Sequence, residues 1–217
     1  MKTVIFDMDG LLVDSEVRAI KAWREVANEY GIPDIEALFP YMMGTNPETR
    51  RVIFEKHYGT AYNFPECNEK VRDLAHKYEE EEPIPLKKGA KELLSFLSEN
   101  GYKIGLASSG KRETIERRMK GHGLWQYFDV VISGEMVKIS KPDPEIFLLC
   151  AEKLGVSPSD STVLEDSPNG ITAAKAAGMR PVMVPDLYMP EKNIAEMAYA
   201  VYDSLLEVKT AFENGNL

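Results

Sequence analysis

The chain has 217 residues, and its 26 Lys and Arg against 35 Asp and Glu give a formal net charge of -9. This acidic balance argues against a nucleic-acid-binding protein, because binding to a phosphate backbone needs clustered positive charge. With 44% apolar and 28% charged residues, the composition is typical of a globular protein with a substantial core and not of a disordered chain.

Short apolar runs alternate along the chain with amphipathic stretches of helical periodicity. The runs cover residues 3–6, 103–107, 129–133, 162–165, 181–184 and 200–202. Most are bounded by Gly, Pro or Asp, as buried parallel strands commonly are. Strands that alternate with helices predict an α/β fold in which helices cover both faces of a parallel sheet.

One interval breaks this alternation. Between a helix that starts near Ser15 and a turn at residues 85–89, about 70 residues show helical periodicity and no convincing strand. We therefore expect a helical cap at residues 17–83, inserted into an α/β core formed by residues 1–16 and 84–217. Such a cap could close over a ligand.

Polar side chains gather where the expected strands end. Ligands of parallel α/β sheets bind outside the carboxyl ends of the strands, so these positions are candidates for a functional site. The candidates are Asp7, Asp9, Ser108, Ser109, Lys141, Glu165 and Asp166. Any one of them could be an ordinary helix cap, but all of them together at one edge are hard to explain in that way.

The sequence FDMDG places Asp7 and Asp9 two positions apart at the end of a strand. Alone, it could be a polar turn in which Gly10 relieves backbone strain. Glu165 and Asp166 favour a functional site, because two unit charges about 4 Å apart repel by about 4 kcal/mol at an effective dielectric of about 20. Several carboxylates at one edge need a cation, and hard oxygen ligands with no His or Cys nearby in sequence predict Mg²⁺ and not zinc.

Lys141 supplies a positive charge. Alone it would be interpreted as a surface lysine before a helix that begins near Pro142, but beside carboxylates it would offset their repulsion and neutralise a phosphoryl oxygen. Ser108, followed by Ser109 and Gly110, offers a hydroxyl and backbone N–H groups at a strand-to-helix turn, where anions commonly bind.

These motifs resemble those of the haloacid dehalogenase superfamily of aspartyl-phosphate enzymes. The chain carries four of them in order: DMDGLLVDSE with Asp7 and Asp9, LASSG with Ser108, SKPDPEIF with Lys141, and LEDSPNGITAAKAAGM with Glu165 and Asp166. The match covers nearly the whole chain. The helical insert is similar to the cap of the β-phosphoglucomutase-like branch, so the resemblance implies a Rossmann-like core with an inserted helical cap.

The resemblance implies a Mg²⁺-dependent phosphatase that hydrolyses a small phosphorylated metabolite. Asp7 would attack phosphorus and form an aspartyl phosphate, while Asp9 would act first as general acid and then as general base. Dehalogenase members lack the second aspartate of this motif, so Asp9 favours phosphoryl chemistry over C–Cl cleavage.

The same resemblance implies the ligands of the metal and of the phosphoryl group. Mg²⁺ would be held by the Asp7 carboxylate, the Asp9 backbone carbonyl and Asp166, with Glu165 either as a ligand or as a support. The phosphoryl group would be held by Ser108, Ser109 and Lys141.

A sugar phosphomutase is the main alternative. β-Phosphoglucomutases carry a His at the position of Ala19 in this sequence. They also carry an Arg three residues after the cap-loop glycine, and in this sequence the residue three positions after Gly44 is Pro47. Both differences remove groups associated with a bisphosphorylated sugar, and we therefore favour a phosphatase. Arg50 or Arg51 could compensate, although an exposed helix face is the simpler interpretation. A sensor of phosphorylated metabolites is disfavoured, because a binding protein has no need of an acid–base residue such as Asp9.

The remaining features concern location and partners. Cys67 and Cys150 lie far apart in sequence and do not form the paired framework common in secreted chains. The N-terminal sequence lacks the length and cleavage site of a signal peptide, and no stretch approaches about 18 uninterrupted apolar residues. We expect a cytoplasmic monomer that binds neither nucleic acid nor membranes.

Overall fold

The structure is a computed structural model and describes residues 3–42, 47–187 and 189–217. It contains two compact units: the core unit, Met1–Val13 with Leu86–Leu217, and the cap unit, Asp14–Pro85. The sequence predicts boundaries between core and cap after residues 16 and 83, and the boundaries in the structure, after Val13 and Pro85, differ from these by a few residues.

The core unit is built on a six-stranded sheet in which every neighbouring pair is parallel. Its strands are β1 (Thr3–Phe6), β2 (Lys103–Ser108), β3 (Val130–Ser133), β4 (Ser161–Glu165), β5 (Arg180–Met183) and β6 (Ala200–Val201). They lie in the order β3-β2-β1-β4-β5-β6. The predicted parallel α/β fold is confirmed, and β1 lies between β2 and β4, the strands that carry the second and fourth motifs.

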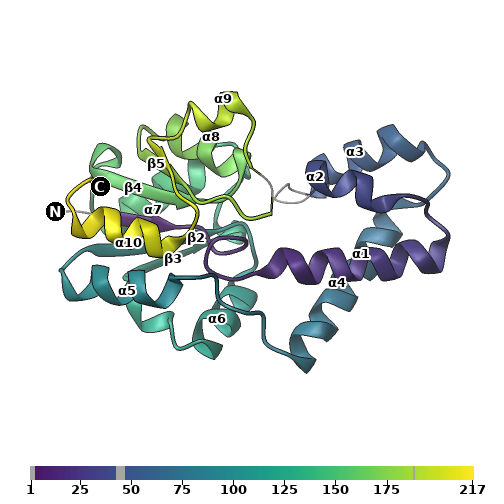
Figure 1. Cartoon of the computed structure of the whole chain (residues 1–217), viewed down its shortest axis with the longest axis horizontal. Helices are drawn as coiled ribbons and strands as arrows, with labels where there is room; N and C mark the ends of the chain where they lie inside the picture. The colour runs from purple at the N-terminus through teal and green to yellow at the C-terminus, as the bar shows by residue number, and fades with distance from the viewer. Residues whose placement is uncertain (1–2, 43–46, 188) are drawn as a thin grey trace. The chain divides into compact units, whose positions relative to one another are not determined.

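Helices cover both faces of this sheet (Figure 1). On one face, buried side chains of α7 (Glu145–Leu154) and α8 (Pro168–Ala176) form a hydrophobic cluster with Ile5, Ala107 and Val163 of the central strands. On the opposite face, α5 (Ala90–Glu99) and α10 (Leu205–Glu213) lie side by side. The remaining helices of the unit are α6 (Arg112–Gly121), α9 (Lys192–Ala195) and the short 3-10 turns η2 (Trp125–Tyr127), η3 (Gly134–Met136) and η4 (Pro158–Asp160).

The regular elements among the described residues of the cap unit are all helices, joined by turns, with no strand. Its elements are α1 (Ser15–Tyr30), η1 (Ile35–Leu38), α2 (Phe39–Met42), α3 (Pro47–Tyr58) and α4 (Phe64–Glu81). The ring of Trp23 on α1 lies 5.9 Å from that of Phe54 and 6.1 Å from that of Phe64. These rings are the centre of a hydrophobic cluster made only of cap-unit residues, so this unit has a core of its own.

The chain leaves and re-enters the core unit at one place. Val13 pairs with Leu86 in an antiparallel bridge, and the Lys87 N–H donates to the Leu12 carbonyl at 2.9 Å. The cap unit is therefore an insertion between two adjacent points of the core unit.

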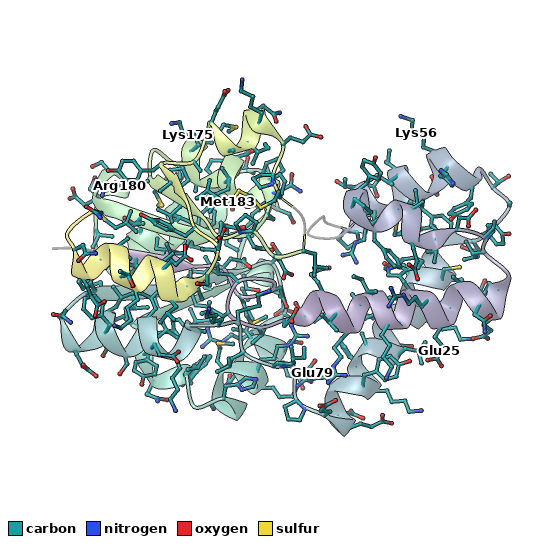
Figure 2. The ribbon with its side chains drawn as sticks, viewed as in Figure 1. Glu25, Lys56, Glu79, Lys175, Arg180 and Met183 are labelled. Atoms are coloured by element: carbon teal, nitrogen blue, oxygen red, sulfur yellow. The ribbon has the colours of Figure 1, made fainter. Side chains whose placement is uncertain are left out.

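Charged side chains lie mostly at the surface. Lys56 on α3 and Lys175 on α8, for example, extend outward from their helices (Figure 2). Among the described residues, the most deeply buried charged ones are Asp7, Lys141 and Glu165, which are 7%, 6% and 1% exposed. Since burying a charge is costly unless it is paired, these three point to a functional site. No described helix has the length and apolar character needed to cross a membrane.

Candidate active site

The strand register brings the first and fourth motifs together. Phe6, the last residue of β1, pairs with Leu106 of β2 on one side and with Leu164 of β4 on the other. The Asp7 N–H donates to the Leu164 carbonyl at 3.0 Å, so Asp7 lies beside Glu165 at the carboxyl edge of the sheet.

Lys141 joins these two carboxylates. Its Nζ donates to Asp7 Oδ1 at 2.6 Å, to Glu165 Oε1 at 2.7 Å and to the Ala107 carbonyl at 3.2 Å. Lys141 comes from the loop before α7, so only the tertiary structure places it here. The three donors of the ammonium all have partners, which fixes the positive charge in a single position.

Burial changes the acid–base properties of this group. Loss of solvent raises the pKa of Asp7 to about 7, against the attraction of Lys141 and with the repulsion of Glu165 and Asp9. Burial also acts to lower the pKa of Lys141, but attraction to Asp7 and Glu165 outweighs it and raises that pKa above its usual range. Lys141 therefore stays charged at neutral pH.

Glu165 is held on both carboxylate oxygens. Lys141 binds Oε1, while the backbone N–H and the hydroxyl of Ser167 both donate to Oε2 at 2.9 Å. Gly170 makes room for this carboxylate, because a Cβ at that position would lie 1.8 Å from Glu165 Oε1. With both oxygens engaged, Glu165 is suited to support Lys141 and less suited to bind a metal.

The carboxylates of Asp7, Glu165 and Asp166 each offer an oxygen, and these oxygens lie within 4.8 Å of one another. Because Glu165 is already engaged, Asp7 and Asp166 are the better candidates to hold a cation. Gly10, at φ 81°, provides the space: a Cβ there would lie 2.2 Å from Asp166 Oδ2. Among the described residues this cluster offers only carboxylate oxygens, a donor set that fits Mg²⁺.

Ser108 and Ser109 lie at the carboxyl end of β2, at the same edge of the sheet. Ser108 is buried, and its Oγ accepts a hydrogen bond from the Gly110 N–H at 3.1 Å. This leaves the hydroxyl hydrogen available to donate. The side chain of Ser109 is exposed.

Asp9 has a partner that the sequence did not indicate. Arg118 of α6 donates from Nη1 to Asp9 Oδ1 in a close ion pair. Arg118 belongs to none of the four motifs, and its position on an amphipathic helix carries no signal of such a contact.

A second pair missed by the sequence consists of Lys87 and Asp186, which form a close ion pair. Asp186 Oδ2 lies 3.3 Å from the point that a Cβ on Gly10 would occupy, a point that is also next to Asp166. Asp186 follows β5 in the sequence VPD, so the search for polar residues after strands could have found it.

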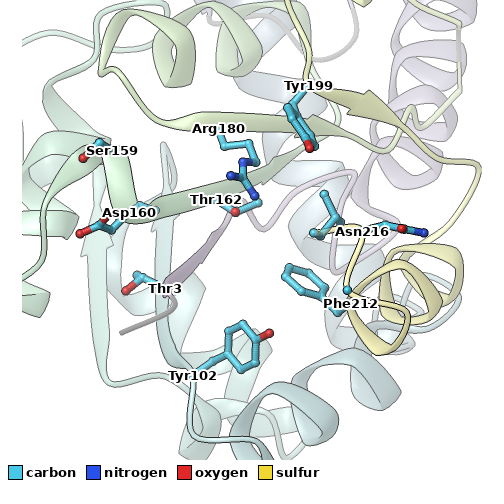
Figure 3. Close-up of a pocket in the computed structure, with 12 residues that line it drawn as sticks. Thr3, Tyr102, Ser159, Asp160, Thr162, Arg180, Tyr199, Phe212 and Asn216 are labelled. Atoms are coloured by element: carbon cyan, nitrogen blue, oxygen red, sulfur yellow. The ribbon is translucent and has the colours of Figure 1, made fainter.

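The opposite edge of the sheet has a pocket of about 550 Å³ (Figure 3). It is lined by residues at the amino ends of the strands, among them Thr3, Thr162 and Arg180, with Arg180 stacked on Tyr199 at 4.7 Å. None of the seven candidate residues lines it. Ligands of such sheets bind at the carboxyl edge, so we do not assign this pocket to the reaction.

Comparisons with known proteins agree with this site. The family model of haloacid dehalogenase-like hydrolases matches residues 4–184. A phosphorylated carbohydrates phosphatase from Thermotoga maritima is 34% identical over 219 residues, which cover 99% of this chain and 92% of that protein. The β-phosphoglucomutase of Bacillus subtilis is also 34% identical, over 82% of this chain and 81% of its own length.

A solved structure shares the fold of this chain. CbbY from Rhodobacter sphaeroides, determined in complex with phosphate, has a TM-score of 0.77 and 27% identity and covers 96% of both chains. The predictions of the fold and of a β-phosphoglucomutase-like member are confirmed. The chain belongs to the family of haloacid dehalogenase-like hydrolases.

Proposed function

We propose that this protein is a Mg²⁺-dependent phosphatase that hydrolyses a small phosphorylated metabolite, such as a sugar phosphate, through an aspartyl phosphate on Asp7. The observation that carries the proposal is the buried Lys141 ammonium, which joins Asp7 to Glu165. It sets a fixed positive charge beside a carboxylate nucleophile. Relatives named as phosphatases of phosphorylated carbohydrates and of hexitols support this substrate class.

Asp7 is the nucleophile in this proposal. Its backbone N–H is bound to Leu164 and its Oδ1 to Lys141, so the carboxylate has a defined orientation. An Asp7 oxygen attacks phosphorus as the bond to the leaving oxygen breaks. The covalent intermediate divides a very slow hydrolysis into two easier steps.

Asp9 moves the proton in both steps. It gives a proton to the leaving alkoxide while the aspartyl phosphate forms. It then removes a proton from the water whose oxygen attacks phosphorus, and this second step releases inorganic phosphate and restores the Asp7 carboxylate. The Asp9 side chain is 36% exposed, which gives both the alkoxide and water access to it.

Lys141 and Ser108 act on the phosphoryl oxygens in this scheme. Lys141 offers charge and Ser108 a hydroxyl donor, which position the group and neutralise its charge. Glu165, bound to Lys141 and Ser167, keeps the ammonium in place. The exposed Ser109 lies at the same strand end and would add a donor there.

Asp7 and Asp166, with the Asp9 backbone carbonyl, would hold Mg²⁺. Bound there, the ion would supply the positive charge that offsets the carboxylates and a phosphoryl oxygen. The short distances within this carboxylate cluster support the proposal.

A panel of phosphorylated metabolites assayed with Mg²⁺ and with EDTA tests this function. We expect phosphate release that requires Mg²⁺ and is abolished in Asp7→Asn. Thermal stabilisation by a metabolite without any product would indicate a sensor instead. An Asp7→Asn protein that retained near-normal turnover would rule out the aspartyl-phosphate mechanism.

A β-phosphoglucomutase-type reaction is the second candidate, and Arg50 is the observation that favours it. The sequence predicts an exposed helix face for Arg50, but in the structure Arg50 on α3 is partly buried. Burial lowers its pKa against the attraction of Glu16, and its Nε has no hydrogen-bond partner among the described residues. Arg51, in contrast, is exposed and bound to Glu48 at 2.6 Å.

The two positions at which the sequence differs from β-phosphoglucomutases favour a phosphatase. Ala19 lies on α1 and offers no polar group, while Gly44 to Asn46 fall outside the described residues, so the comparison at that loop stays a prediction. A coupled assay for conversion of β-glucose 1-phosphate to glucose 6-phosphate, primed with glucose 1,6-bisphosphate, separates the two candidates. We expect hydrolysis to exceed isomerisation.

A further inference from the structure

The carboxylate proposed to transfer protons in both steps is bound to an arginine far away in sequence. Arg118 Nη1 donates to Asp9 Oδ1, and the two residues are 109 positions apart. Asp9 follows β1, whereas Arg118 lies in the last turn of α6, the helix that follows β2 and the Ser108 motif. The contact therefore lies within the core unit, at the carboxyl edge of the sheet.

The arginine is the better fixed partner. Its side chain is 12% exposed, whereas that of Asp9 is 36% exposed. Ile115 and Met119 on the same helix are fully buried and hold α6 against the core unit. Arg118 therefore presents its guanidinium from a rigid element to a carboxylate that has more freedom.

The backbone around Asp9 is already constrained. Asp9 forms a bridge with Val13, the Gly10 N–H donates to the Val13 carbonyl at 2.9 Å, and the Leu12 N–H donates to the Met8 carbonyl at 2.9 Å. The freedom that remains at Asp9 lies in its side-chain torsions, which have several staggered states. A hydrogen bond to one carboxylate oxygen is enough to select among them.

We propose that Arg118 is a positioning residue that sets the place of the Asp9 carboxylate for proton transfer. The inference rests on the proposed function. Oδ1 receives the hydrogen bond from Arg118, and Oδ2 is then directed to exchange the proton with the leaving oxygen or with water. General acid–base catalysis is worth about 10²–10⁴-fold and requires a separation of about 2.6–3.2 Å, so a misplaced Asp9 loses much of that factor.

The nature of the leaving group distinguishes this role from a structural one. A sugar phosphate leaves as an alkoxide and needs a proton, whereas 4-nitrophenyl phosphate leaves as a stable phenolate and does not. In Arg118→Ala, we expect kcat for a sugar phosphate to fall by about tenfold or more. The rapid first burst of nitrophenolate, which reports formation of the aspartyl phosphate, should change by less than about threefold.

Four further variants make the test selective. Arg118→Lys keeps a donor and a charge and should restore part of the lost kcat. Arg117→Ala removes the same charge from the exposed neighbouring position of α6, and both rates should stay within about twofold of wild type. If Arg118 acts through Asp9, adding Arg118→Ala to Asp9→Asn should cause no further loss.

The outcomes separate the inference from the function on which it rests. A wild-type protein that hydrolyses no phosphate ester overturns the proposed function and this inference with it. If the wild type is active and Arg118→Ala behaves like Arg117→Ala, only the inference is overturned. The same holds if Arg118→Ala lowers the nitrophenolate burst and the turnover of the sugar phosphate equally. Thermal unfolding monitors folding, and if Arg118→Ala does not fold, the same comparison of substrates in Arg118→Lys decides.

Discussion

Three buried charges are concentrated at Asp7, Lys141 and Glu165, and two of them are negative. A lysine between two carboxylates relieves their repulsion, but removing it leaves two acids facing each other out of water. A single residue therefore serves both the stability of the fold and the charge of the site.

Replacement of Lys141 should show this directly. We expect Lys141→Met to lower the free energy of unfolding by about 3–5 kcal/mol, the usual cost of breaking a buried ion pair from one side. Lys175→Met, which removes an exposed lysine, should change it by less than about 0.5 kcal/mol. Urea denaturation measures both, and equal effects would contradict the description of Lys141 as a buried ion-pair partner.

The raised pKa of Asp7 predicts that metal binding depends on pH. The pKa of Asp7 in the folded protein is about 7, above the ordinary value of 3.8. Between these two pH values the unfolded chain loses its proton before the folded protein does, so the metal-free protein loses stability as pH rises. Mg²⁺ binds only the ionised carboxylate, so its stabilising effect should grow from about pH 6 to about pH 8. Thermal melting with and without Mg²⁺ measures it, and Asp7→Asn should show no such growth.

Gly10 provides a test of the space beside Asp166. Gly10→Ala combines an unfavourable positive φ with a Cβ that would lie 2.2 Å from Asp166 Oδ2, so it should weaken Mg²⁺ binding as well as stability. Gly178, at φ 72°, has no heavy atom within 4 Å of its would-be Cβ. Gly178→Ala should thus cost about 1 kcal/mol of stability and leave Mg²⁺ affinity unchanged, as judged by calorimetric titration. Similar Mg²⁺ affinities in both variants would contradict the assignment of Asp166.

At the scale of elements, the turn between β4 and α8 combines three tasks in consecutive residues. Glu165 binds Lys141, and Asp166 belongs to the carboxylate cluster proposed to hold Mg²⁺. Ser167 is the N-cap of α8, with its Oγ accepting from the Gly170 N–H at 3.1 Å. Because Ser167 also donates to Glu165, the start of the helix and the orientation of the site depend on one hydroxyl.

Ser167→Ala should therefore lower stability and activity together. Loss of an N-cap costs about 1 kcal/mol, and loss of one donor to Glu165 should lower kcat by about tenfold. Ser204 is the N-cap of α10, and its Oγ accepts from the Glu207 N–H, but it is not part of the site. Ser204→Ala should cost about the same stability with kcat unchanged, and a matching loss of kcat would argue against the link through Glu165.

At the scale of the whole molecule, the cap unit is an insertion with its own hydrophobic core. All seven candidate site residues lie in the core unit, and Val13 and Leu86 are already paired where the insertion begins and ends. A protein in which a short Gly-Ser linker joins Val13 to Leu86 should thus fold and still bind Mg²⁺. It should hydrolyse 4-nitrophenyl phosphate while discriminating less among sugar phosphates, because the cap residues would be missing. Circular dichroism and steady-state kinetics measure this, and loss of all hydrolysis in a folded, Mg²⁺-binding protein would show that the cap unit is needed for the reaction itself.

The net charge of -9 has different meanings at two scales. Over the molecule it is spread on exposed side chains, whose effects are screened beyond about 8 Å at physiological salt. At the site, we expect the balance between Lys141 and the neighbouring carboxylates to select the ligand. The cytoplasmic location and the monomeric state stay predictions, with both cysteines buried as free thiols.

The sheet, the helical insertion and the motif residues could be predicted from the sequence alone. Each depends on a local pattern: an apolar run makes a strand, and polar residues that follow it lie at the edge where such strands end. The contacts between these side chains could not be predicted in this way, because they form between elements distant in sequence. Lys141 reaches Asp7 across 134 positions and Lys87 reaches Asp186 across 99, while Arg118 binds Asp9 from a helix without a motif. Glu165 accepts hydrogen bonds on both carboxylate oxygens, which favours support of Lys141, and its role toward a metal stays a prediction. Local periodicity places a residue on an element, but its partners are set by the packing of elements distant in sequence.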